Sequence, residues 1–195
     1  MKDAYDDADA TSLYFTVNNT QLHAYRLGDT GNPPLVMLHG MQDVSASLLP
    51  VARKLSEQFC VWMPDLRGHG RSARPGTYSM SAFVYDVYAL LAEHIEQPAA
   101  LFGHSLGGQI CARVAALFPE LVTAAVIVEG LGPSAIAMAT RARSNTDLAQ
   151  EAARLKSVYK HRSRPLPDLE SAARKLAANN PRLGAPRAKA IAAIA

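Results

Sequence analysis

The chain has 195 residues, of which 49% are hydrophobic and 19% charged, a composition typical of a globular domain with a buried core. No apolar run approaches the roughly 18 residues of a membrane span, and the start MKDAYDDADA lacks the basic and apolar order of a signal peptide. Two cysteines, Cys60 and Cys111, are too few for a disulfide framework, so we expect buried, reduced thiols in a cytoplasmic protein.

The charges are unevenly distributed along the chain. Residues 1–130 carry 8 Lys and Arg against 13 Asp and Glu, whereas residues 131–195 carry 12 against 4. A basic segment can indicate an anionic partner. We expect a solvated helical surface and no nucleic acid, because the basic residues lie at helical intervals with few aromatic residues among them.

Strand-like and helix-like segments alternate over the first 130 residues, which predicts a mainly parallel sheet flanked by helices. The predicted elements are strands at Leu13–Val17, Leu22–Leu27 and Pro34–Leu38, a helix at Ser45–Phe59, a strand at Cys60–Met63, a helix at Met80–Ile95, a strand at Ala99–Phe102, a helix at Gly107–Phe118 and a strand at Val122–Val128. The last strand is continuously apolar, which predicts burial on both of its faces.

The second part of the chain, residues 131–195, has no strand-like run. Helix patterns occur near Asp147–Tyr159 and at Leu169–Ala178, where Asn179, Asn180 and Pro181 end the second helix. A third helix is expected to begin near Pro186. We therefore divide the chain into an α/β part at 1–130 and a helical part at 131–195.

Polar residues follow several of the predicted strands. His39 and Gly40, Asp65, the tripeptide 103–105 and Glu129 all stand directly after an apolar run. In open parallel sheets, ligands bind at the carboxyl ends of the strands. The sequence therefore predicts a functional site at this edge of the sheet.

The segment LFGHSLGG (101–108) places Ser105 between a predicted strand and a predicted helix. A serine on such a turn is held in a strained conformation at a helix N-terminus, where free N–H groups favour developing negative charge. Side chains two residues away would collide in this turn, so glycine is expected at 103 and 107, and Gly108 allows the helix to pack closely on the strand. The pattern predicts a nucleophilic serine.

Three motifs occur in order, PLVMLHG (34–40), PDLRGHGRS (64–72) and FGHSLGG (102–108), and together they resemble the α/β-hydrolase family. The resemblance covers roughly residues 12–130. Residues 131–195 resemble the start of the helical cap that many members insert after the sixth strand, with the rest of the cap and the last strands missing. The strings GHSLGG and VEGLGP are most similar to the serine hydrolase-like subgroup.

The resemblance implies Ser105 as nucleophile and the backbone N–H groups of Met41 and Leu106 as the oxyanion hole. It implies hydrolysis of an ester-like bond of a small molecule, such as a carboxylic ester or thioester, through an acyl-serine intermediate. Serine at this position is unlike epoxide hydrolases and haloalkane dehalogenases, which use a carboxylate there. No cluster of side chains has metal-ligand spacing, so neither a metal nor another cofactor is expected.

No histidine fits the general base that a serine nucleophile needs. The family order is serine, acid, histidine, and only His161 follows Ser105, in a basic segment where we expect a surface residue. None of the other histidines is expected to act as the base. His39 and His69 are expected to be structural, and the side chain of His104 is expected to leave the turn in a different direction from that of Ser105. His23 and His94 fall on an early strand and on a helix face. Glu129 is a possible acid, although a buried or cap-contacting carboxylate is the favoured interpretation, and Asp65 is expected to brace its loop through N–H groups or Arg67.

Two alternatives follow from this gap. The chain is a catalytically inactive truncated hydrolase or a binding protein without a histidine base, or it is a fragment of a longer hydrolase. In either case the strand at Val122–Val128 would form an exposed apolar edge. A dinucleotide fingerprint, Gly68-x-Gly70-x-x-Ala73, is also present, but Pro75 and Gly76 block the helix that phosphate binding requires.

Overall fold

The computed structural model describes residues 7–130 and 166–194. Its six strands form one sheet in the order β1-β2-β4-β3-β5-β6. The strands are β1 (Thr11–Val17), β2 (Thr20–Leu27), β3 (Pro34–Leu38), β4 (Cys60–Pro64), β5 (Ala99–His104) and β6 (Val122–Val128). The pairs β3–β4, β3–β5 and β5–β6 are parallel, whereas β2 pairs antiparallel with both β1 and β4. The predicted mainly parallel sheet is confirmed.

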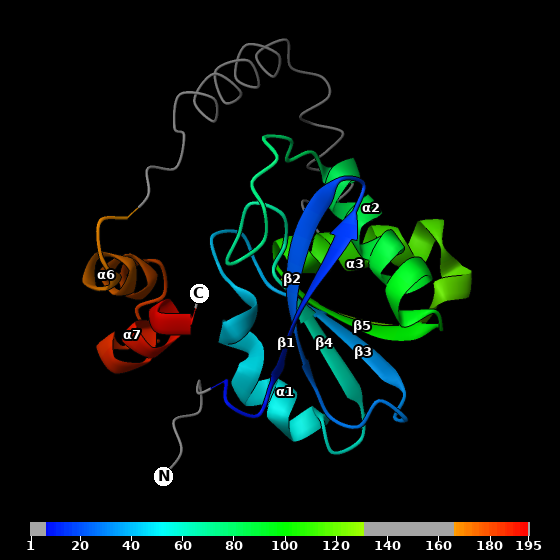
Figure 1. Cartoon of the computed structure of the whole chain (residues 1–195), viewed down its shortest axis with the longest axis horizontal. Helices are drawn as coiled ribbons and strands as arrows, with labels where there is room; N and C mark the ends of the chain where they lie inside the picture. The colour runs from blue at the N-terminus through cyan, green and yellow to red at the C-terminus, as the bar shows by residue number, and fades with distance from the viewer. Residues whose placement is uncertain (1–6, 131–165, 195) are drawn as a thin grey trace.

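Helices cover both faces of this sheet, with α2 and α3 on one side and α1 on the other (Figure 1). The helical elements are η1 (Ser45–Leu48), α1 (Leu49–Leu55), α2 (Met80–Ala89), η2 (Leu90–Ile95), α3 (Leu106–Leu117), η3 (Pro119–Leu121), α6 (Leu169–Asn179) and α7 (Ala185–Ile194). The helix predicted over 80–95 is confirmed, and its last six residues, η2, are π-helical. The helix predicted over 45–59 ends earlier, at Leu55, and begins with a 3-10 turn.

Alternation along the central strand β3 builds the core. Val36 and Leu38 face the cluster that includes α2 and α3, whereas Leu35 and Met37 face the cluster that includes α1. All five residues of β3 are buried, as expected for a parallel strand covered on both faces. Cys60 and Cys111 are buried free thiols, as predicted, and burial raises the pKa of Cys111 to about 12.

The prediction that β6 is buried on both faces is wrong. Positions 123–126 are exposed, and Val126 is 56% exposed. The physical reason is position: β6 ends the strand order, so among the described residues it pairs only with β5, and α3 and η3 pack against it. The apolar composition of β6 therefore belongs to an edge strand that is exposed in the described part of the chain.

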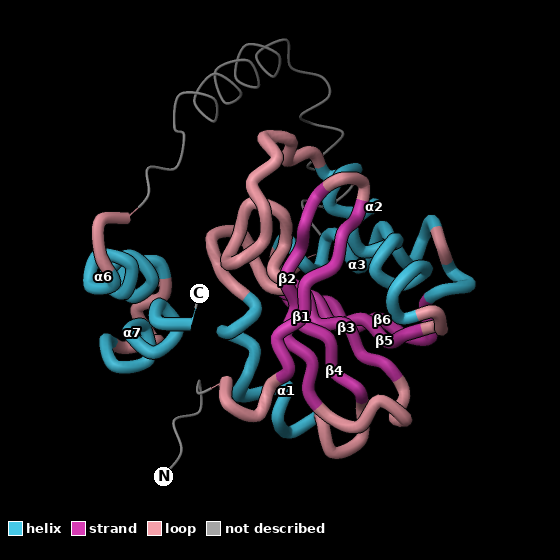
Figure 2. Tube along the Cα trace, viewed as in Figure 1, coloured by secondary structure: helices cyan, strands magenta, loops and turns pink. Residues whose placement is uncertain are grey.

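Helices α6 and α7 pack against each other as a hairpin, which confirms the helices predicted at 169–178 and near 186 (Figure 2). Asp168 caps α6, because its Oδ1 accepts the Ser171 N–H at 2.7 Å. The helix predicted at 147–159 lies outside the described residues, as does the first half of the predicted cap segment. Among the described helices, none has the length and apolar character that crossing a membrane requires.

Candidate functional site

Ser105 lies on the turn between β5 and α3, with φ of 52° and ψ of −110°. A residue other than glycine in such a conformation costs of order 1–3 kcal/mol and persists only where the surroundings enforce it. The enforcing contacts are close: a Cβ on Gly103 would lie 2.4 Å from the carbonyl of Gly107, and one on Gly107 would lie 2.3 Å from the carbonyl oxygen of Leu38. The expected need for both glycines is confirmed.

The loop after β3 runs beside this turn. A Cβ on Gly40 would lie 3.4 Å from the Cβ of Ser105 and 3.1 Å from Nδ1 of His104, so the two backbones are in close proximity. Leu106 is the first residue of α3 and its N–H has no earlier helical carbonyl to bond. Met41 follows Gly40 and is 58% exposed. Two backbone segments with N–H groups thus approach Ser105.

His39 fixes the base of this loop. Its Nδ1 donates to the carbonyl oxygen of Gly40 at 2.8 Å, and its Nε2 accepts the N–H of Leu66 at 3.0 Å. These two bonds need a neutral ring, and burial lowers the pKa of His39, with the nearby His69 adding to the effect. Both ring nitrogens are occupied, so His39 is structural, as expected.

The remaining described histidines also lie in other contacts. His69 bonds the carbonyl oxygen of Arg67 through Nδ1 at 3.0 Å, and its Nε2 accepts the Gln42 N–H at 3.3 Å. The ring of His94 packs on Phe15 with centroids 5.1 Å apart. His161 lies outside the described residues. Within residues 7–130 and 166–194, no histidine other than His104 borders Ser105.

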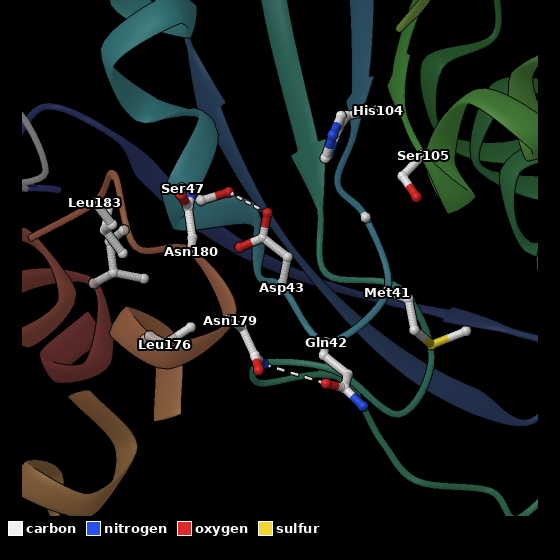
Figure 3. Close-up of a pocket in the computed structure, with 12 residues that line it drawn as sticks. Met41, Gln42, Asp43, Ser47, His104, Ser105, Leu176, Asn179, Asn180 and Leu183 are labelled. Carbon is white, nitrogen blue, oxygen red and sulfur yellow. Dashed lines mark hydrogen bonds between the residues drawn. The ribbon is translucent and has the colours of Figure 1, made fainter. Parts of the chain in front are cut away.

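His104 precedes Ser105, and the two side chains leave the chain in different directions, as expected (Figure 3). Its Nε2 lies 3.9 Å from Oε2 of Glu129. Glu129 was expected to be a buried or cap-contacting carboxylate. Burial is wrong, since its side chain is 81% exposed, and the first half of the predicted cap segment lies outside the described residues. The cause of the exposure is its place at the open end of the edge strand β6, with φ of 54°.

Away from this turn, a serine, a histidine and an aspartate are joined by hydrogen bonds. Ser12 Oγ lies 3.0 Å from His23 Nε2, and His23 Nδ1 lies 2.8 Å from Asp65 Oδ2. Ser12 does not border the cavity described below. Cross-strand register explains the contact, because Ser12 opposes Tyr25, two residues along β2 from His23. No local pattern predicts this contact, because the three residues are distant in the chain.

Asp65 holds several segments together, as expected. Besides His23 it accepts the N–H groups of Ser45 at 2.8 Å and Arg71 at 3.1 Å. Burial would raise the pKa of Asp65, but these bonds outweigh it and the pKa lies below its usual range. Of the two partners expected for Asp65, N–H groups or Arg67, the structure shows the N–H groups, and Arg67 forms a buried ion pair with Asp86 of α2.

Acid is expected to destabilise the fold through His39 and Asp65. Each has a folded-state pKa below its usual value, so the unfolded chain takes up protons that the folded chain resists. Stability should therefore be lost as pH falls below about 6.5, and further near the usual aspartate range of about 4. Urea unfolding from pH 8 to pH 4 measures this, and a midpoint that rises on acidification would contradict it.

A cavity of about 490 Å³ opens beside the turn (Figure 3). One wall comes from the loop after β3 and from the Ser105 turn between β5 and α3, and the other comes from the α6–α7 hairpin. Its lining residues are Gly40, Met41, Gln42, Asp43, Ser47, His104, Ser105, Leu176, Asn179, Asn180, Leu183 and Ile191. From the sequence, Asn179 and Asn180 were predicted only to end a helix. No local pattern indicated that Gln42 or Ser47 would line a cavity.

The loop with the dinucleotide pattern does not form a phosphate site in this geometry. A Cβ on Gly70 would lie 2.3 Å from the carboxyl carbon of Asp65, so the carboxylate fills the space beside that glycine. The next helix, α2, begins only at Met80. A carboxylate repels phosphate, and no helix N-terminus follows the glycines.

Comparison with known proteins decides the family. The family model described as alpha/beta hydrolase fold matches residues 33–183. The chain belongs to the α/β-hydrolase fold family. The thioesterase domain from the curacin biosynthetic pathway has a similar fold, with a TM-score of 0.81 at 23% identity over 95% of this chain and 65% of that one.

Two sequence relatives illustrate the range of the family. Uncharacterized protein Rv2715 of Mycobacterium tuberculosis is 33% identical over 68% of this chain and 38% of its own length. The 2-(acetamidomethylene)succinate hydrolase of Mesorhizobium japonicum is 32% identical over 63% of this chain and 45% of its own. The chain thus spans less than half the length of these relatives. Others carry the names of esterases, lipases and epoxide hydrolases.

Proposed function

We propose that the chain carries the nucleophile and oxyanion hole of a serine hydrolase that acts on an ester-like bond of a small molecule. The observation that carries this proposal is the strained backbone of Ser105 at the edge of a cavity. Strain of this kind gathers at active sites, where the fold exposes a reactive group at a cost to its own stability. A serine at this position favours acyl transfer. Epoxide opening is less favoured, because the family's epoxide hydrolases use a carboxylate as the nucleophile at this position.

The proposed step is an attack of Ser105 Oγ on the carbonyl carbon of the substrate. The new O–C bond places negative charge on the former carbonyl oxygen, which the N–H groups of Met41 and Leu106 stabilise. Loss of one such donor costs other hydrolases about 3–4 kcal/mol. The tetrahedral intermediate then expels an alcohol or thiol and leaves an acyl-serine, which water hydrolyses. A base must take the Ser105 proton, and none of the described histidines is placed to do so.

The alternative is an inactive hydrolase or a binding protein on the same fold. The observation that favours it concerns the described residues, among which no histidine is placed as a base for Ser105. His39 and His69 use both ring nitrogens in contacts with the backbone, and His104 points away from Ser105. A serine with an oxyanion hole but no base keeps only a small part of the full rate. The two candidates differ in whether Ser105 reacts at all.

Labelling with an alkyl fluorophosphonate distinguishes these candidates. We expect the folded chain to be labelled once, and Ser105→Ala to abolish the label. Ser47→Ala is the matched control, because Ser47 lines the same cavity but is bonded to Asp43 at 2.9 Å and should leave labelling unchanged. Peptide mapping identifies the site. A folded sample without label would support the inactive alternative. Label on Ser12 would assign the reactivity to the hydrogen-bonded set of Ser12, His23 and Asp65.

A further inference from the structure

Gln42 stands next to Met41 in a conformation that needs support. Its φ of 61° is in the left-handed region, which costs a residue other than glycine about 1–3 kcal/mol. Two contacts hold it. Its N–H donates to His69 Nε2 at 3.3 Å, and its Oε1 accepts from Nδ2 of Asn179 at 3.2 Å (Figure 3). The second contact joins positions 137 residues apart in the chain.

Asn179 belongs to a hairpin that is fixed to the sheet domain by its other helix. Ala188 and Ile191 of α7 are buried at 0% and 1% exposure, and α7 lies against η1. No residue of α6 is buried. Docking of α7 therefore positions α6, and the last residue of α6 presents its amide group to the loop that follows β3.

We propose that Asn179 and Gln42 form a clamp through which the α6–α7 hairpin holds the Met41 N–H in position beside Ser105. Both are positioning residues and neither touches the reacting atoms. The inference rests on the proposed function, because the clamp matters for catalysis only if the Met41 N–H stabilises an oxyanion. An oxyanion donor acts through its fixed placement, so a loop that is free to rotate stabilises the charge less well.

Two variants of similar size separate the clamp from other changes at the same contact. Asn179→Leu removes the whole amide group, so Gln42 finds no partner there even if its own amide turns round, whereas Gln42→Glu keeps an acceptor for the Asn179 N–H. With a fluorophosphonate probe, we expect the maximal labelling rate of Asn179→Leu to fall about fivefold, the effect of one hydrogen bond, with little change in the probe concentration for half-maximal rate. Gln42→Glu should lose clearly less.

Arg174→Gln is the control on the same helix. Its side chain is 68% exposed and it does not line the cavity, so this variant should label at the wild-type rate. Equal effects of Asn179→Leu and Gln42→Glu, or the reverse order, would overturn the clamp. So would a wild-type rate in Asn179→Leu.

Hydrogen exchange tests the clamp even without reactivity. We expect a peptide that contains positions 40–43 to exchange faster in Asn179→Leu than in wild type, and Gln42→Glu to remain closer to wild type. If wild-type Ser105 does not label, the proposed function fails, and the exchange of this peptide still decides whether the clamp exists. Unchanged exchange in Asn179→Leu would contradict it.

Discussion

Gly107→Ala is expected to destabilise the fold by about 3 kcal/mol or more, the upper range for overpacking a closed site. The new Cβ would lie 2.3 Å from the carbonyl oxygen of Leu38 and 2.7 Å from the carbonyl carbon. These are backbone atoms of the central strand β3, so no side-chain rotation relieves the clash. The helix α3 must move away from β3, and Ser105 moves with it. Urea unfolding monitored by circular dichroism measures the loss.

Gly31→Ala is the control for this substitution. The nearest atom to a Cβ on Gly31 is Oδ1 of Asp29 at 3.4 Å, an ordinary contact with a movable side chain. We expect the shift of its urea midpoint from wild type to be a small fraction of the shift that Gly107→Ala causes. Equal midpoints for Gly107→Ala and wild type would contradict the close packing of α3 on β3 that builds the Ser105 turn.

Asp86→Ala is expected to cost about 3–5 kcal/mol of unfolding free energy, because it leaves the buried guanidinium of Arg67 without a partner. The two residues are 3% and 4% exposed, and Nε of Arg67 donates to Asp86 Oδ2 at 2.6 Å. The guanidinium group of arginine stays protonated in proteins, so the cation does not neutralise itself when the carboxylate is removed. Thermal and urea unfolding provide the measurement.

A double variant tests whether the lost partner is the cause. Arg67→Met with Asp86→Leu removes both charges and keeps apolar volume, so we expect it to recover most of the stability that Asp86→Ala loses. The double variant also removes the hydrogen bond from Arg67 to the carbonyl oxygen of Thr77 at 3.3 Å, so we expect its recovery to be incomplete. An Asp86→Ala protein as stable as wild type would contradict the buried pair.

The sequence predicted the elements whose causes are local. Strand and helix positions follow from hydrophobic period, and the turn at Ser105 follows from the glycines on either side of it. The exposure of β6 could not be read from its apolar run, because the same pattern suits a buried strand and an exposed edge. Strand order decides between them, and it depends on pairing across the whole sheet.

The site was predicted in the same uneven way. The positions of Ser105 and of the loop after β3 beside one cavity were predicted because each follows a strand directly, whereas the role of the Met41 N–H is implied by the resemblance and stays a prediction. The pairing of Arg67 with Asp86, the Ser12 contact with His23, and the cavity wall from α6 and α7 were missed. Each joins residues that are distant in the chain, and no spacing rule connects a helix end at Asn179 with a turn at Gln42.

Acylation by an activated ester tests most directly whether Ser105 is a nucleophile. After reaction with p-nitrophenyl acetate, rapid acid quench and peptide mapping, we expect an acetyl group on the peptide that contains Ser105. We expect this group to be absent in Ser105→Ala. The release of p-nitrophenol should approach one equivalent per chain. A folded protein with no adduct, or with the acetyl group on Ser12 or Ser47, would contradict the assignment of Ser105 as the nucleophile.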